Sequence, residues 1–197
     1  MKTILHGATC LVGLLVLASC GQGEPAVVAT EPVAEAAAVS KPKLTAAVVD
    51  GTTLRRFLVV ANRADTGSIN ADGSAYELRS TATKRVAFGD GDGVLARVPA
   101  ETAAQLTGRR VKVTINARSA PVNGSSVFKV MYFRPGSKTG SDWQEFSVSD
   151  AFAPLSFEYD VPDSASSNGF DNIGFWADPE GKGRGIEISA ITVETVD

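Results

Sequence analysis

Apolar and polar residues alternate through most of the chain after residue 44, which is the pattern of β-strands with one buried face. The alternation is clearest in residues 110–118, where valine, isoleucine and alanine occupy the odd positions and polar residues the even ones. The same period predicts strands at residues 126–134, 143–148, 155–161, 172–177 and 185–196, and shorter ones at 57–60, 76–78, 85–88 and 94–98. In the last long strand the phase changes after Ile188, so we expect a β-bulge at Ser189 and Ala190.

One stretch has the features of a short helix instead. Pro99 stands where a first helical residue belongs, good helix formers continue to Leu106, and Gly108 follows the end. Eight to ten strands with this one helix predict an all-β fold, a β-sandwich of two antiparallel sheets. Residues 44–197, about 150 in number, are enough for one domain with its own hydrophobic core.

The N-terminal 43 residues lack this alternation. Lys2 precedes an apolar run at residues 8–18, which is too short for a membrane span of about 20 residues and indicates a cleaved signal peptide, residues 1–19. Residues 20–43 are rich in alanine, valine and proline and have no sustained helical or strand period. We therefore expect a flexible tether in front of the domain.

The end of the apolar run, Leu17-Ala18-Ser19-Cys20, resembles the lipobox of bacterial lipoproteins. The resemblance implies cleavage before Cys20, attachment of acyl chains such as palmitate to that residue, and a protein held on the membrane by its lipid anchor. Gly21, in place of the aspartate associated with inner-membrane retention, favours the outer membrane. The alternative is an ordinary secretory signal that is cut nearby.

The amino-acid composition limits the partners and the kinds of catalysis that are expected for this chain. The chain has 19 basic and 22 acidic residues, a net charge of −3, and loss of Lys2 with the signal makes it about −4, so nucleic acid is not expected as a partner. His6 and Cys10 also lie in the signal, which leaves the mature chain without histidine and with Cys20 alone, the residue that the lipid blocks. Histidine-dependent and thiol-dependent catalysis, zinc sites of these ligands and disulfides are thereby excluded, and no cofactor is expected.

Several motifs in a fixed order resemble the galactose-binding-domain-like jelly rolls, the fold of many carbohydrate-binding modules. They are the strand-helix-Gly-strand order at residues 97–111 and the segments 142–146 (DWQEF), 172–176 (NIGFW) and 185–188 (GIEI), and the resemblance covers residues 48–196. It implies a jelly-roll sandwich of two antiparallel sheets that often binds glycans on a concave sheet or at loop tips. It does not name a ligand.

A sugar-binding face needs aromatic rings for the apolar patches of the sugar and polar groups for its hydroxyls. Strand parity places suitable side chains opposite the core, and Gly174 beside a tryptophan leaves room for a sugar ring. The predicted ligand-binding residues are Arg97, Asn116, Arg118, Trp143, Asn172 and Trp176. The alternative is that both tryptophans cover edges of the core and that Arg97 and Arg118 are solvated or pair with Glu158 and Asp160.

Asp90 and Asp92, set among glycines, are candidate calcium ligands. The match to an EF-hand loop fails, because Val94 and Leu95 stand where an oxygen ligand and a glycine are required. The preferred interpretation is a hairpin turn with solvated aspartates and no metal site. Carboxylate pairs that could serve a glycosidase exist on the strands, but they fit the ordinary pattern of a solvated face, so no enzyme activity is expected.

These observations predict a membrane-anchored lipoprotein whose non-catalytic sandwich binds a cell-envelope or extracellular carbohydrate. Two alternatives of other classes stay open. One is an interaction protein that docks an envelope protein through the same exposed aromatic residues, and the other is a glycoside hydrolase.

Overall fold

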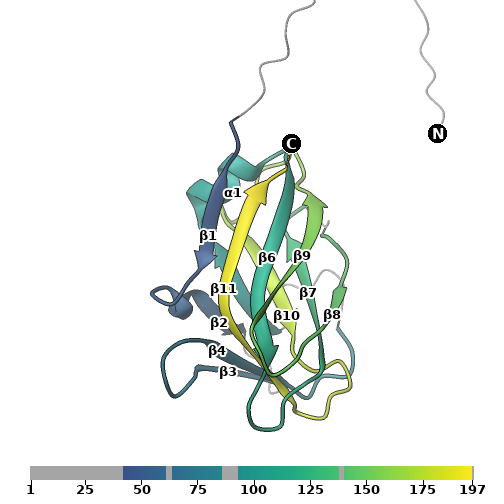
Figure 1. Cartoon of the computed structure of the whole chain (residues 1–197). Coiled ribbons are helices and arrows are strands. Elements are labelled where there is room, and N and C mark those ends of the chain that lie inside the picture. Colours follow the sequence, from purple (N-terminus) through teal and green to yellow (C-terminus); the bar gives the residue numbers. More distant parts are fainter. Residues whose placement is uncertain (1–41, 61–63, 86–92, 138–139, 197) are drawn as a thin grey trace, which may run out of the picture. The chain divides into compact units, whose positions relative to one another are not determined.

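The computed structural model of the protein describes residues 42–60, 64–85, 93–137 and 140–196 (Figure 1). Within these ranges eleven strands form two antiparallel sheets, accompanied by one α-helix, which confirms the expected all-β sandwich. The predicted signal peptide, Cys20 and nearly all of the predicted tether lie outside the described residues. The domain limits therefore stay a prediction.

The two sheets interleave along the chain. The strands of the six-stranded sheet are β1 (Thr45–Val49), β3 (Asp65–Ile69), β4 (Tyr76–Ser80), β6 (Arg110–Ser119), β9 (Ala153–Asp160) and β11 (Gly185–Thr195). Those of the five-stranded sheet are β2 (Phe57–Val60), β5 (Gly93–Val98), β7 (Val127–Phe133), β8 (Gln144–Ser147) and β10 (Asp171–Trp176).

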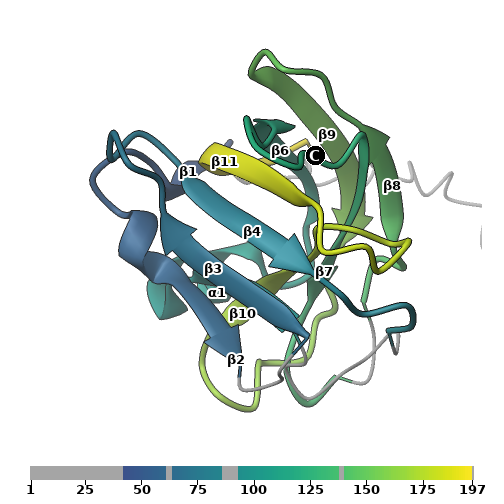
Figure 2. The ribbon, with the colours of Figure 1, turned by 90° about the horizontal axis from the view of Figure 1, so that it is seen from below.

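Neighbouring strands are mostly distant in sequence. The six-stranded sheet has the order β3-β4-β11-β6-β9, with β1 also paired to β11, and Figure 2 shows β3, β4 and β11 side by side. The five-stranded sheet has the order β2-β5-β10-β7-β8. Because β1 pairs with β11 along residues 191–194, the start of the domain lies beside its C-terminal strand (Figure 1).

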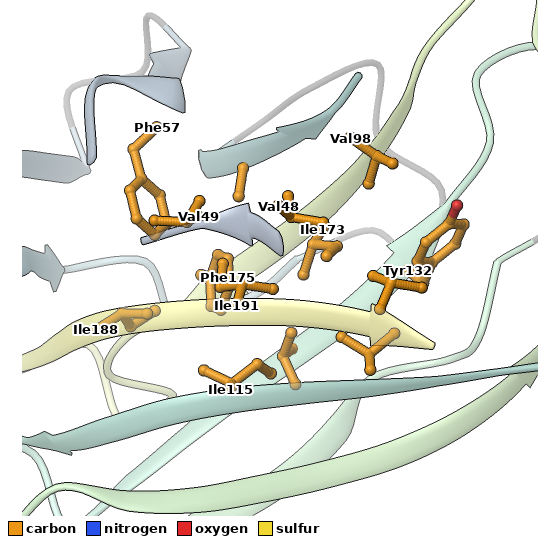
Figure 3. Packing of buried hydrophobic residues seen from close by; sticks show 14 of the residues in the cluster. Val48, Val49, Phe57, Val98, Ile115, Tyr132, Ile173, Phe175, Ile188 and Ile191 are labelled. Carbon is orange, nitrogen blue, oxygen red and sulfur yellow. The ribbon is translucent and has the colours of Figure 1, made fainter. Parts of the chain in front are cut away.

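The hydrophobic core lies between the inner faces of the sheets, where the period-2 pattern predicts it. Ile115 and Ile191 come from the six-stranded sheet, Ile173 and Phe175 from the five-stranded sheet, and all are at most 1% exposed. Figure 3 shows these side chains interleaved between the two layers. Since no disulfide joins the sheets within the described residues, burial of this apolar surface is the main source of their cohesion.

The β-bulge expected in the last strand is confirmed. The register between β11 and β6 shifts between Ile188 and Ala190. The extra residue returns both Ile188 and Ile191 to the core, where each is 0% exposed. A strand without the bulge would send one of these two side chains to the outer face.

A buried ionic network fixes the helix α1 (Ala100–Leu106) to the five-stranded sheet. Arg134 donates through Nε and Nη2 to the two carboxylate oxygens of Asp171, at 2.9 and 2.8 Å, and both side chains are at most 1% exposed. Its other N–H groups reach Thr107 Oγ1 and the carbonyl oxygen of Ala103 at the helix. Burial and the Asp171 carboxylate raise the pKa of Tyr132 well above its usual value, so the hydroxyl stays protonated and donates to Asp171 at 2.5 Å.

The structure also contains strands that the alternation does not predict. Residues 46–49 of β1 are four consecutive alanine and valine residues, and β3 is largely polar, so neither has a clear period of two. β1 pairs with the remote strand β11, whereas β3 pairs with β4, the next strand along the chain. The predicted strand at residues 85–88 lies mostly outside the described residues. Pro99 is the N-cap of α1 and not its first residue.

Candidate functional site

Strand parity places six candidate residues away from the core, but the structure divides them between two opposite surfaces. Asn116 and Arg118 lie on the outer face of the six-stranded sheet, because they alternate with the core residues of β6. Arg97, Asn172 and Trp176 lie on the outer face of the five-stranded sheet, and Trp143 joins them through its contact with Trp176. The core separates these two surfaces, so the six residues do not form one site.

Trp176 is covered by its neighbours. It is 8% exposed, and its Nε1–H donates to the carbonyl oxygen of Ala82 at 2.9 Å. The ring of Trp143 meets it edge-on at 6.0 Å between centroids, and the cations of Arg85 and Lys129 lie 5.9 and 5.7 Å from its centroid. The open aromatic platform that sugar stacking requires is therefore not present at this residue, and its role in binding stays a prediction.

The room expected above Gly174 is largely filled. A Cβ atom added there would lie 3.5 Å from side-chain atoms of Leu95, Met131 and Phe133, an ordinary van der Waals distance. Leu95 and Met131 are 6% and 2% exposed, so the middle of this outer face is an apolar layer of its own.

Asn172 is the first unusual residue of this face. It is 4% exposed, and its Oδ1 is buried without a hydrogen-bond partner. It lies opposite Arg97 of β5 and Phe133 of β7 in the strand register. A buried acceptor that forms no hydrogen bond costs about 1–3 kcal/mol, so its retention calls for an explanation outside the stability of the fold.

Arg97 is the second unusual residue of this face. Its side chain is on the exposed part of β5, and its guanidinium carbon lies 3.9 Å from the ring centroid of Phe170. In the described residues Arg97 forms no ion pair and no hydrogen bond through its side chain. Phe170 was missed by the sequence analysis because it precedes β10 in a loop, outside any alternating pattern.

Trp143 contributes a third unmatched polar atom. The residue is half-buried, and its Nε1–H is buried with no acceptor. It precedes β8, whose Glu145 pairs with Lys129 of β7 at 3.1 Å on the same outer face. One donor, one acceptor and one cation without partners thus occur on a single sheet face. We call this outer face of the five-stranded sheet, with Arg97, Phe133, Trp143, Phe170 and Asn172, the candidate face.

The opposite surface is internally paired. Arg118 donates to Oε2 of Glu187 at 2.8 and 2.6 Å and stacks on Phe152 at 4.4 Å, and Asn116 donates to Ser189 Oγ at 2.7 Å. Arg118 is therefore paired, but not with the two carboxylates that the sequence analysis considered, which both pair with Arg110. With their hydrogen bonds formed inside the protein, these side chains have little left to offer a ligand.

Within the described ranges no group of three or more histidine, cysteine, aspartate or glutamate side chains is arranged to hold a metal ion. The buried carboxylate of Asp178 accepts backbone N–H groups of Glu180, Lys182 and Arg184, at 3.1, 2.7 and 3.0 Å, and so organises the turn before β11. The calcium candidates Asp90 and Asp92 lie outside the described residues. In the described part of the chain, no helix is long and apolar enough to cross a bilayer.

No protein-family model matches the chain, and no curated protein matches it in sequence. Among solved structures, the CBM22-1 xylan-binding domain of Paenibacillus barcinonensis Xyn10C is similar over 78% of this chain and 94% of its own, with 11% identity and a TM-score of 0.50. The CBM22-1–CBM22-2 tandem domain from Xyn10C is similar over 78% of this chain and 44% of its own, with 12% identity and a TM-score of 0.52. The chain thus has the β-sandwich fold of carbohydrate-binding modules, and at such identity the likeness concerns the fold alone.

Proposed function

We propose that this domain binds carbohydrate on the candidate face and that it performs no catalysis. The observation that carries the proposal is the buried, unpartnered Oδ1 of Asn172 beside the unpaired guanidinium of Arg97. A fold shared with a xylan-binding domain makes a glycan the natural class of ligand.

The unmatched polar atoms suit the hydrogen-bonding chemistry of a sugar. A hydroxyl group both donates and accepts, so one can serve the acceptor of Asn172 and another the donor of Trp143. The half-buried rings of Phe133 and Phe170 supply apolar surface for the C–H side of a sugar ring. Because Asn172 is covered in the free protein, a neighbouring side chain has to turn aside first. Arg97, which no hydrogen bond restrains, is the neighbour suited to do so.

The same proposal places the protein on the outer membrane. Lipid on Cys20 holds it there, and residues 21–43 give the domain reach toward a cell-envelope or extracellular glycan. Support for the anchor comes from the Leu-Ala-Ser-Cys order alone. Two or more acyl chains give stable anchoring, whereas a single chain gives only marginal binding.

A glycan array probed with the full chain tests the binding function. Binding to a polysaccharide class is the expected result, and Trp143→Phe should weaken it about fivefold or more because the substitution keeps an aromatic ring and removes one N–H donor. Asn116→Leu, on the outer face of the other sheet, is the matched control and should leave the affinity unchanged. Absence of binding to any glycan, or equal loss in both variants, would contradict the proposal and favour a protein partner instead.

A further inference from the structure

Arg97 differs from the other arginines on the outer faces of the sheets. Arg79, Arg110 and Arg118 all lie on the outer face of the six-stranded sheet, and each pairs with a glutamate at 2.6 to 2.8 Å. Arg97 has no carboxylate partner among the described residues and rests on the ring of Phe170 at 3.9 Å. Stacking of this kind is weak at an exposed site, so the guanidinium can leave the ring and offer its N–H groups to a second group.

The neighbourhood of Arg97 offers both a cation and an acceptor. Asn172 lies directly opposite it in the register of β5 and β10, and its buried Oδ1 has no donor. Two further cations near this face are already paired, Lys129 with Glu145 at 3.1 Å and Arg85 with Asp65. The face therefore presents one unpaired positive charge next to one unpaired acceptor.

A uronic acid has the complementary groups. Its carboxylate accepts two parallel N–H bonds from a guanidinium, and its ring hydroxyls donate to an amide oxygen. A neutral sugar would leave the charge of Arg97 without a counter-charge after its water is displaced, which costs binding free energy. We propose that the ligand is an acidic glycan, with one uronate carboxylate bound by Arg97 and a neighbouring hydroxyl bound by Asn172.

This inference rests on the proposed function and specifies the substrate class of the same face. When Arg97 turns from Phe170 toward the carboxylate, Asn172 loses a neighbour and becomes accessible, so the two contacts form together. The net charge of −3 opposes the approach of an anionic polymer at long range. Selectivity for the acidic glycan thus comes from the local contact with Arg97 and not from the overall electrostatic field of the protein.

Matched pairs of polysaccharides test the inference. Glucuronoxylan, alginate, polygalacturonate and hyaluronan are each compared with their carboxyl-reduced form, which keeps the backbone and replaces the carboxylates by primary alcohols. The affinity of the full chain is measured by titration calorimetry. We expect at least one acidic form to bind about tenfold or more tightly than its reduced form, because a hydrogen-bonded charge is worth more than a neutral contact.

Two variants assign the preference to the residue. Arg97→Gln should abolish the preference for the acidic form while its thermal unfolding stays that of the native chain, since the guanidinium forms no ion pair or hydrogen bond among the described residues. Arg55→Gln removes an exposed charge elsewhere, on the 3-10 helix Leu54–Arg56, and should keep the preference. Equal loss in both variants would mean that overall charge, not Arg97, selects the acid, and would overturn the inference.

The remaining outcomes separate this inference from the proposed function. Equal affinity for the acidic and reduced forms overturns the uronate assignment and leaves carbohydrate binding intact. If the chain binds neither form of any pair, the uronate assignment is overturned. If it also binds no glycan on the array, the proposed carbohydrate-binding function is overturned as well.

Discussion

Substitution of Asn172 by leucine tests whether the candidate face has been kept for binding at the expense of stability. The native side chain buries an acceptor that forms no hydrogen bond, on a residue that is 4% exposed. Such a group costs about 1–3 kcal/mol, and leucine has the same number and branching of side-chain heavy atoms and no polar atom. We therefore expect Asn172→Leu to raise the free energy of unfolding by about 1 kcal/mol, the lower end of that range.

The matched control is Asn116→Leu on the outer face of the six-stranded sheet. The amide of Asn116 donates to Ser189 Oγ at 2.7 Å, so the same substitution removes a hydrogen bond that exists. Its expected effect is a loss of about 0.5–1.5 kcal/mol. The two asparagines are thus predicted to respond with opposite signs to an identical chemical change.

Urea denaturation of the native chain and the two variants measures the difference. Because the m-value reports the surface exposed on unfolding, it should be the same for all three, so that a shift in midpoint is a shift in stability. The gain in Asn172→Leu corresponds to about 2–4 °C in melting temperature for a domain of this size. A destabilised Asn172→Leu, losing as much as Asn116→Leu, would refute the reasoning, because it would show that the Asn172 amide is satisfied in solution.

Three further predictions concern the core, the ionic network and the anchor. Trp176→Ala should cost about 3–5 kcal/mol of unfolding free energy, as truncation of a buried tryptophan does, and a loss below 1 kcal/mol would return this residue to the list of open sugar platforms. Asp171→Asn should cost about 3–5 kcal/mol because it leaves the buried charge of Arg134 uncompensated, whereas Arg110→Gln at a solvated pair should have a far smaller effect; denaturation curves that show equal losses would argue against a buried network. Cys20→Ala should release the protein from the membrane fraction without changing its melting temperature, and a variant that still needs detergent for extraction would disprove the lipid anchor.

Most of the strands, and the side of each that faces the core, could be predicted from the amino-acid sequence alone. Burial in a sheet has a period of two, so the pattern at residues 110–118 and the change of phase after Ile188 are local signals that need no knowledge of neighbours. The bulge in β11 and the helix after Pro99 were predictable for the same reason. β1 and β3 were not, because β1 is an unbroken apolar run paired with a remote strand and β3 is a largely polar strand at the edge of its sheet, so neither alternates.

Which outward-facing residues share a surface depends on how the strands are divided between the two sheets, and this was visible only in the folded chain. Parity says that Arg97 and Arg118 both point away from the core, but strands β5 and β6, separated by a short helix, belong to different sheets. Strand parity also does not indicate that Ala82 and Arg85 cover Trp176, since these two contacts join residues about 90 positions apart in the sequence. The hydrogen-bond partner of a polar atom depends on long-range strand pairing, which no local pattern in the sequence indicates. The polar atoms without hydrogen-bond partners could therefore be found only in the folded chain.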